Sequence, residues 1–221
     1  MGLVERFTFF EMTEELVAKC GEFSCHQDPD IDSFFHSKYA LYYSEMIGRS
    51  YCFVDETNRE IVCAFTVSHS ILNRNQLSSS KQRKVQAFVN NEAKRKDYPS
   101  TLIGQLVVFD KYRDQNLGNE LMDYIKGLFA LPQRDCSYRI DAFGFNNCGS
   151  RFLLVDATNT DKVLDYYLKN GFDFLYESVD LEIEAIAKTM SIQECNIDSV
   201  KEYHQTRLMF FDMINKYSKH L

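Results

Sequence analysis

A polar turn between an apolar strand and a helix is the segment of this sequence best suited to bind an anion. The apolar run Leu106-Val107-Val108 is followed by polar residues 110–116, and a helical pattern begins near Leu117. The first amides of a helix have no partner within it, and the helix dipole adds partial positive charge at that end. Such a turn binds phosphate without needing a lysine. The alternative, a strand–turn–helix with no ligand, stays open on spacing alone.

The spacing within this turn resembles motif A of the GNAT acetyltransferases, Q/R-x-x-G-x-G/A after a strand. It reads Arg113-x-x-Asn116-x-Gly118, so Asn116 stands where the family has its first glycine. Asparagine tolerates left-handed backbone geometry better than other non-glycine residues, and Gly118 lets a ligand approach the backbone closely. The resemblance implies coenzyme A binding by Leu106, Val107, Val108, Arg113, Asp114, Gln115, Asn116, Leu117, Gly118, Asn119 and Asn159.

A second segment, residues 163–172, resembles motif B of the same family, A-x-x-F-Y-x-x-x-G-F. Tyr167 falls on the motif's tyrosine, and Gly171-Phe172 on its final Gly-Phe. The resemblance implies that Tyr167 is the general acid that protonates the departing CoA thiolate. A phenol with a pKa near 10 is mostly protonated at neutral pH and can donate to sulfur. The alternative is that Tyr167 only packs on a helix.

The elements that must position these residues alternate between strand and helix periods, which predicts an α/β fold. The predicted strands are 4–10, 51–54, 61–67, 101–109, 151–157, 172–175 and 208–212. The predicted helices are 13–19, 31–46, 79–96, 117–129 and 161–169. The resemblance implies the GNAT fold, a mixed central sheet with a β-bulge or splay between the fourth and fifth strands and flanking helices. We expect one domain over residues 1–221, with an insertion at about 177–205.

The inserted segment is polar and is predicted to be partly helical. Glu182 and Glu184 alternate within it and are expected to face solvent. The five histidines show no paired metal spacing, so Cys25-His26 with His36 is interpreted as incidental and no metal is expected.

The charge is uneven along the 221 residues, which carry a formal net charge of −7. Segment 74–97 has seven positive and two negative residues, a local charge of +5. A phosphate backbone could bind there, although charge runs are usually solvated faces. Seven cysteines without paired spacing, no signal-peptide pattern and no membrane-spanning apolar run predict a cytoplasmic protein without membrane association.

Within the family, the chain most resembles the toxin-type branch that acetylates aminoacyl-tRNA. The likeness includes Asp28-Pro29-Asp30-Ile31-Asp32 before a helix and Leu102–Leu106 entering motif A. It implies acetyl-CoA as co-substrate, an amine acceptor, an antitoxin partner and a homodimer, with segment 74–97 as a tRNA contact. Three readings compete: an acetyltransferase for aminoacyl-tRNA, one for a small amine or protein amine, and a weakened acyl-CoA-binding module.

Overall fold

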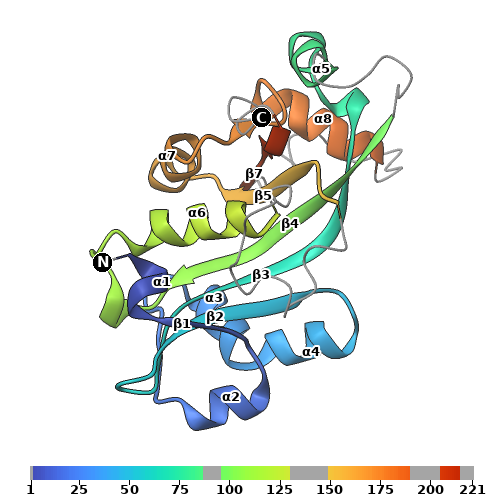
Figure 1. Ribbon diagram of the computed structural model, residues 1–221. Helices are drawn as coiled ribbons and strands as arrows, with labels where there is room; N and C mark the ends of the chain where they lie inside the picture. The colour runs from blue at the N-terminus through green and yellow to red at the C-terminus, as the bar shows by residue number, and fades with distance from the viewer. Residues whose placement is uncertain (1, 87–95, 130–148, 190–204, 215–221) are drawn as a thin grey trace. The chain divides into compact units, whose positions relative to one another are not determined.

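The computed structural model describes residues 2–86, 96–129, 149–189 and 205–214 (Figure 1). The helices are α1 (Leu3–Arg6), α2 (Glu14–Lys19), α3 (Pro29–Ser33), the π-helical η1 (Phe34–Lys38), α4 (Tyr39–Ser44), α5 (Ser79–Gln86), α6 (Leu117–Phe129), α7 (Asp161–Lys169) and α8 (Val179–Thr189), with short 3₁₀ turns η2 (Arg74–Gln76) and η3 (Asp110–Tyr112). The strands are β1 (Thr8–Glu11), β2 (Arg49–Asp55), β3 (Glu60–Asn73), β4 (Asp97–Val108), β5 (Phe152–Thr158), β6 (Asp173–Phe174) and β7 (Thr206–Asp212).

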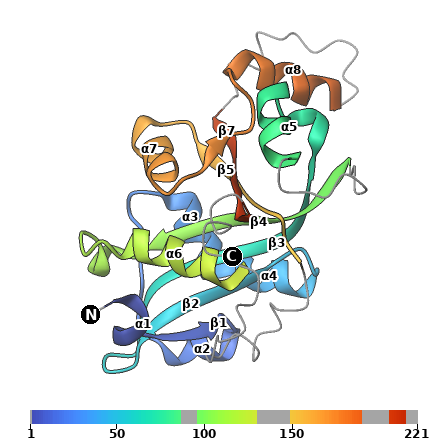
Figure 2. The ribbon, with the colours of Figure 1, turned by 45° about the horizontal axis from the view of Figure 1, so that its top comes forward.

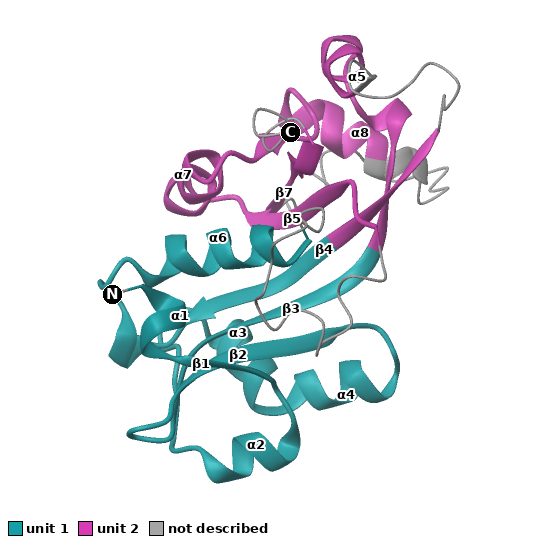
Figure 3. Ribbon diagram, viewed as in Figure 1, with its two compact units in different colours: residues 1–69, 102–148 teal, residues 70–101, 149–221 magenta. Residues whose placement is uncertain are grey.

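The described strands form a seven-stranded sheet in the order β1-β2-β3-β4-β5-β7-β6. The pairs β1–β2, β2–β3, β5–β7 and β6–β7 are antiparallel, and β4–β5 is parallel. The predicted mixed α/β sheet with flanking helices is therefore confirmed. The chain divides into two compact units, residues 1–69 with 102–148 and residues 70–101 with 149–221 (Figure 3).

Unit 1 has apolar side chains on both faces of its strands, as a sheet covered by helices on both sides requires. Phe9 and Phe53 point toward α6, where their rings lie 4.9 and 4.8 Å from that of Tyr124. The alternate residues Cys52 and Val54 belong to a buried cluster with the α3–α4 segment. Figure 2 shows α6 along one face of β1–β3 and α4 on the other.

The segment predicted as one helix over 31–46 consists of α3, η1 and α4 in succession. Asp28 caps it by accepting a hydrogen bond from the Ile31 amide at 3.1 Å, and Pro29 occupies the first turn, where no amide is needed. The prediction of a strand over 4–10 was wrong at its start, because residues 3–6 form α1. The Gly2 carbonyl accepts from the amides of Glu5 and Arg6, which closes that short helix.

Unit 2 contains two buried ion pairs. Arg151 at the start of β5 contacts Asp212 at the end of β7 at 2.9 Å, and both side chains are 7% exposed. Glu182 of α8 contacts Arg207 of β7 at 2.7 Å. Glu182 is therefore buried, at 1% exposure, which contradicts the expectation that it faces solvent, whereas Glu184 is exposed as expected. The arginine 25 residues further along the chain provides the charge partner that burial of a carboxylate requires.

The C-terminal end of α7 follows the sequence prediction closely. Gly171 adopts a left-handed φ of 82°, and its amide donates to the Leu168 carbonyl at 2.9 Å. The predicted strand 172–175 is reduced to the two residues of β6.

The strand predicted over 101–109 begins earlier than expected, and two predicted segments are described only in part. The helix predicted over 79–96 is described as α5 up to Gln86, residues 87–95 lie outside the described part, and strand β4 already begins at Asp97 and contains Pro99. Insertion 177–205 contains α8, and residues 190–204 lie outside the described part. The single domain over 1–221 and the strand splay stay predictions.

Candidate functional site

The turn after β4 has a backbone shape that few side chains allow. After η3, Asp114 and Asn116 take left-handed φ values of 61° and 59°. This geometry costs about 1–2 kcal/mol for most residues, and asparagine and aspartate tolerate it best among non-glycine types. Asn116 therefore has the left-handed geometry that asparagine was expected to tolerate in place of the motif's glycine. The Asn116 side chain also accepts from Nδ2 of Asn119 at 2.7 Å.

This backbone leaves several amides of the turn without a hydrogen-bond partner among the described residues. In the described part of the chain, the amides of Asp114, Gln115, Asn116 and Leu117 donate no hydrogen bond of standard geometry. The side chains of residues 114–116 are exposed, so the turn faces solvent. Consecutive amides in such a turn, at the start of the 13-residue helix α6, are donors of the kind that bind anions in other proteins.

The turn is anchored to the β2–β3 hairpin by charged groups. The Tyr112 hydroxyl donates to Oε2 of Glu60 at 2.7 Å and to Oδ2 of Asp55 at 3.2 Å. Lys111 Nζ donates to the Glu60 carboxylate at 2.6 Å. The hydrogen bonds from Lys111 and Tyr112 hold the pKa of Glu60 below its usual value, while burial and the Glu60 carboxylate raise the pKa of Tyr112.

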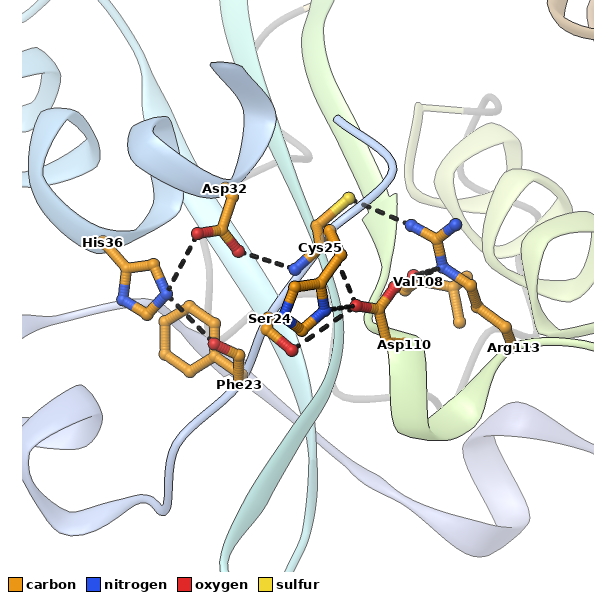
Figure 4. Close-up of polar contacts among 9 residues, drawn as sticks. Phe23, Ser24, Cys25, Asp32, His36, Val108, Asp110 and Arg113 are labelled. Carbon is orange, nitrogen blue, oxygen red and sulfur yellow. Dashed lines mark hydrogen bonds and ion pairs between the residues drawn. The ribbon is translucent and has the colours of Figure 1, made fainter. Parts of the chain in front are cut away.

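On its other side the turn is anchored by Asp110 to residues 23–26 (Figure 4). Asp110 Oδ2 accepts from the His26 amide at 2.9 Å and contacts the His26 ring Nδ1 at 2.5 Å. These hydrogen bonds, with the nearby Arg113 guanidinium, hold the pKa of Asp110 below its usual value. The Asp110 amide in turn donates to the Ser24 carbonyl at 3.0 Å.

Arg113, the charged residue of the motif, is directed back into its own loop. Its Nε donates to the Val108 carbonyl at 3.1 Å and lies 3.1 Å from Oδ1 of Asp110. Its Nη2 donates to Sγ of Cys25 at 3.0 Å, and burial raises the pKa of that thiol. The guanidinium thus ties the turn to Val108, Asp110 and Cys25.

The remaining residues of the predicted set lie on β4 and α6. Val107 and Leu117 are buried at 4% and 1% exposure, so only their backbone can face a ligand. Leu106, Val108 and Gly118 are half-buried, and Asn119 is exposed.

Cys25-His26 with His36 was interpreted from the sequence as incidental rather than as a zinc site, and in the fold these residues make structural hydrogen bonds. Cys25 donates its amide to Oδ1 of Asp32 at 2.6 Å, and His36 Nε2 lies 3.0 Å from the Phe23 carbonyl (Figure 4). Their spacing carries no motif that could have revealed this, because the partners meet only through the fold. Within the described ranges no three His, Cys, Asp or Glu side chains form a metal-binding group, and none of the helices there could span a membrane.

Unit 2 holds the other two predicted site residues. Tyr167 is half-buried on α7, and its ring lies 5.4 Å from that of Phe172. Burial raises its pKa to about 12, so the phenol is protonated at neutral pH. Within the described part of the chain, its hydroxyl has no hydrogen-bond partner. Asn159 is exposed just after β5, and its amide donates to the Gln205 carbonyl at 2.7 Å.

The basic segment 74–97 is described only in part, since Lys94 and Arg95 lie outside the described residues. Lys81 is turned inward, where Nζ donates to the Phe174 carbonyl at 2.5 Å and burial lowers its pKa. Arg83 and Lys84 on α5 are exposed.

No family model matches this sequence, and no curated protein matches it. Three-dimensional comparison does find similar structures. AtaTR bound with AcCoA is similar over 98% of this chain and 99% of its own, with a TM-score of 0.61 and 17% identity. AtaT complexed with acetyl-methionyl-tRNAfMet is similar over 97% and 99%, with a TM-score of 0.60 and 17% identity. A tyrosine-to-phenylalanine mutant of KacT is similar over 98% and 99%, with a TM-score of 0.60 and 16% identity. The chain therefore has the fold of the GNAT acetyltransferases, as the two motifs predicted.

Proposed function

We propose that the chain is an acetyl-CoA-dependent N-acetyltransferase of the toxin type, which transfers an acetyl group to the amine of an aminoacyl-tRNA. The observation that carries the proposal is the run of unpartnered amides from Asp114 to Leu117 on an exposed turn. Similar folds support it, since AtaTR has been seen bound with AcCoA and AtaT with acetyl-methionyl-tRNAfMet.

The turn fits the diphosphate of coenzyme A. Its amides are donors of the kind that hold phosphate at a helix start, and the α6 dipole favours negative charge there. The left-handed φ of Asn116 supports an intact turn over a weakened binding module, because a glycine at this motif position would favour the same backbone region. The amides of residues 114–117 would hold the diphosphate, and the β4 backbone near Val107 and Val108 would pair with the pantetheine arm.

Acetyl-CoA, when bound, supplies the acetyl group as a thioester that a neutral amine takes by direct attack. Tyr167 donates its hydroxyl proton to the sulfur as the carbon–sulfur bond breaks. Because burial raises the pKa of Tyr167 to about 12, the phenol carries its proton at neutral pH before the transfer begins. The missing hydrogen-bond partner within the described residues leaves the hydroxyl available for that donation.

The acceptor is the finer part of the proposal. Exposed Arg83 and Lys84 give α5 a cationic surface suited to a phosphate backbone. A small amine or a protein amine is the competing acceptor, and the net charge of −7 favours it over nucleic acid in general.

The test measures acetyl-CoA binding and turnover in variants of two neighbouring tyrosines. Acetyl-CoA should raise the melting temperature of the wild type and of both variants, Tyr167→Phe and Tyr166→Phe. Tyr167→Phe should lower kcat about 10²- to 10⁴-fold in a thiol-release assay, the range for general acids, while Tyr166→Phe keeps it. Full turnover in Tyr167→Phe would remove the acid role, and no thermal shift with acetyl-CoA would remove the enzyme assignment.

The acceptor is decided by the same assay with aminoacyl-tRNA, free amino acids and polyamines. Product with aminoacyl-tRNA alone, and arrest of translation that disappears in Tyr167→Phe, support the toxin-type function. Turnover only with a small amine would contradict it.

A further inference from the structure

The phosphate-binding turn lacks an outward-facing cation of its own. Lys111 is bound to Glu60, and Arg113 is bound to Asp110 and to the Val108 carbonyl. Asp114 is exposed at the turn and adds a negative charge. A diphosphate on these amides would therefore meet dipoles but no free positive side chain from residues 110–117.

The N-terminal segment brings a cation to this place from far away in the sequence. The Leu3 amide donates to Oε2 of Glu120 in the first turn of α6, which fixes α1 at that helix end. Phe7 is buried, with its ring edge-on to that of Tyr112 at 5.7 Å. Both contacts lie within unit 1.

Arg6 lies between these two anchors. Its Nη2 donates to Oε1 of Gln115 at 2.7 Å, and its guanidinium lies 4.6 Å from the centre of the Phe7 ring. The side chain is exposed, and within the described part of the chain it has no carboxylate partner. It is a fixed but unneutralised cation on the turn whose amides are unpartnered.

We infer that Arg6 is a further coenzyme A-binding residue, which supplies the positive charge for a phosphate group held at residues 114–117. The inference rests on the proposed function. The guanidinium is planar and carries several donors, so it can keep its bond to Gln115 while another N–H meets a phosphate oxygen. The contact offsets the repulsion from Asp114 and Glu120, which the α6 dipole alone would have to overcome.

The same geometry allows a purely structural role, in which Arg6 only braces Gln115. The two roles predict different effects on acetyl-CoA affinity when the charge at position 6 is changed or when the ligand lacks a phosphate group. Arg6→Lys keeps the charge, Arg6→Gln removes it, and Gln115→Ala removes the brace while leaving the backbone amide in place.

The test measures Kd for acetyl-CoA, dephospho-acetyl-CoA and S-acetyl-pantetheine by calorimetry at several salt concentrations. Arg6→Gln should weaken acetyl-CoA binding about 3- to 10-fold and flatten its salt dependence, as the loss of one charge-assisted contact at an exposed site predicts. Arg6→Lys should weaken acetyl-CoA binding less than Arg6→Gln does. The Kd for S-acetyl-pantetheine should be the same in all variants. Lys38→Gln removes an exposed charge on another helix of the same unit and should leave the Kd for acetyl-CoA unchanged.

The dephospho compound identifies the phosphate. If Arg6→Gln weakens the binding of dephospho-acetyl-CoA as much as that of acetyl-CoA, the contact is with the diphosphate. If Arg6→Gln no longer weakens the binding of dephospho-acetyl-CoA, the contact is with the 3′-phosphate. If Arg6→Gln binds acetyl-CoA as tightly as the wild type, or if Gln115→Ala loses as much affinity as Arg6→Gln, the inference about Arg6 is overturned. Neither result would contradict the proposed function. A wild type that binds no acetyl-CoA would instead overturn the proposed function.

Discussion

Charged residues serve opposite purposes in the two units. In unit 2, Glu182 and Arg207 are 1% and 9% exposed, and the Glu182 carboxylate also accepts from the Leu208 amide, so their hydrogen bonds are used internally. In unit 1, Asp110 is about a quarter exposed, and it orders a turn whose amides remain without partners among the described residues. Buried, paired charge fixes architecture in unit 2, whereas the partly exposed charge in unit 1 lies beside amides that have no partner among the described residues.

Removing the buried carboxylate of Glu182 is the most severe test of this difference between the two units. Glu182→Ala should lower the free energy of unfolding by about 3–5 kcal/mol, because Arg207 would remain buried without its partner. Urea denaturation measures the change. Glu184→Ala, on the exposed face of the same helix, should stay within about 0.5 kcal/mol of the wild type. Similar losses for both variants would show that the Glu182–Arg207 pair does not anchor α8.

The turn in unit 1 should respond to backbone geometry more than to side-chain contacts. Asn116→Val should cost about 1–2 kcal/mol of stability, because a β-branched residue is strained at a φ of 59°. Asn116→Gly should keep stability and acetyl-CoA binding. Asn119→Ala removes the same side-chain hydrogen bond without touching that φ, so it serves as the control in thermal denaturation. An equal loss in Asn119→Ala and Asn116→Val would assign the cost to the hydrogen bond.

The smallest effect concerns the partly exposed Asp110. Its folded-state pKa is lowered, so the stabilisation is present above the unfolded-state value of about 4 and is lost as pH falls through the folded-state value. The melting temperatures of the wild type and Asp110→Asn should therefore differ at pH 7 and converge in acid. Asp156→Asn, at an exposed position on β5, serves as the control, because it replaces an aspartate without touching the Asp110 hydrogen bonds. If the difference in melting temperature between the wild type and Asp110→Asn grows toward low pH, the stabilising role of the Asp110 carboxylate is contradicted.

The sequence alone allowed prediction of most elements and of the turn that carries the candidate site. The apolar run ending at Val108, the polar turn and the helix from Leu117 are local patterns, and their periods follow from strand and helix geometry. The left-handed residue at position 116 and the glycine cap at Gly171 were likewise predictable, because few residue types accept a positive φ.

Only the tertiary structure decided which charges are buried, paired or free. Glu182 and Glu184 look alike in sequence, and only the position of Arg207 on β7 separates them. Arg6 and Gln115 are 109 residues apart, and the local sequence around Arg6 predicted a strand instead of helix α1. Periodicity reports the local conformation of the backbone, while pairing between distant polar groups depends on packing that no local pattern encodes.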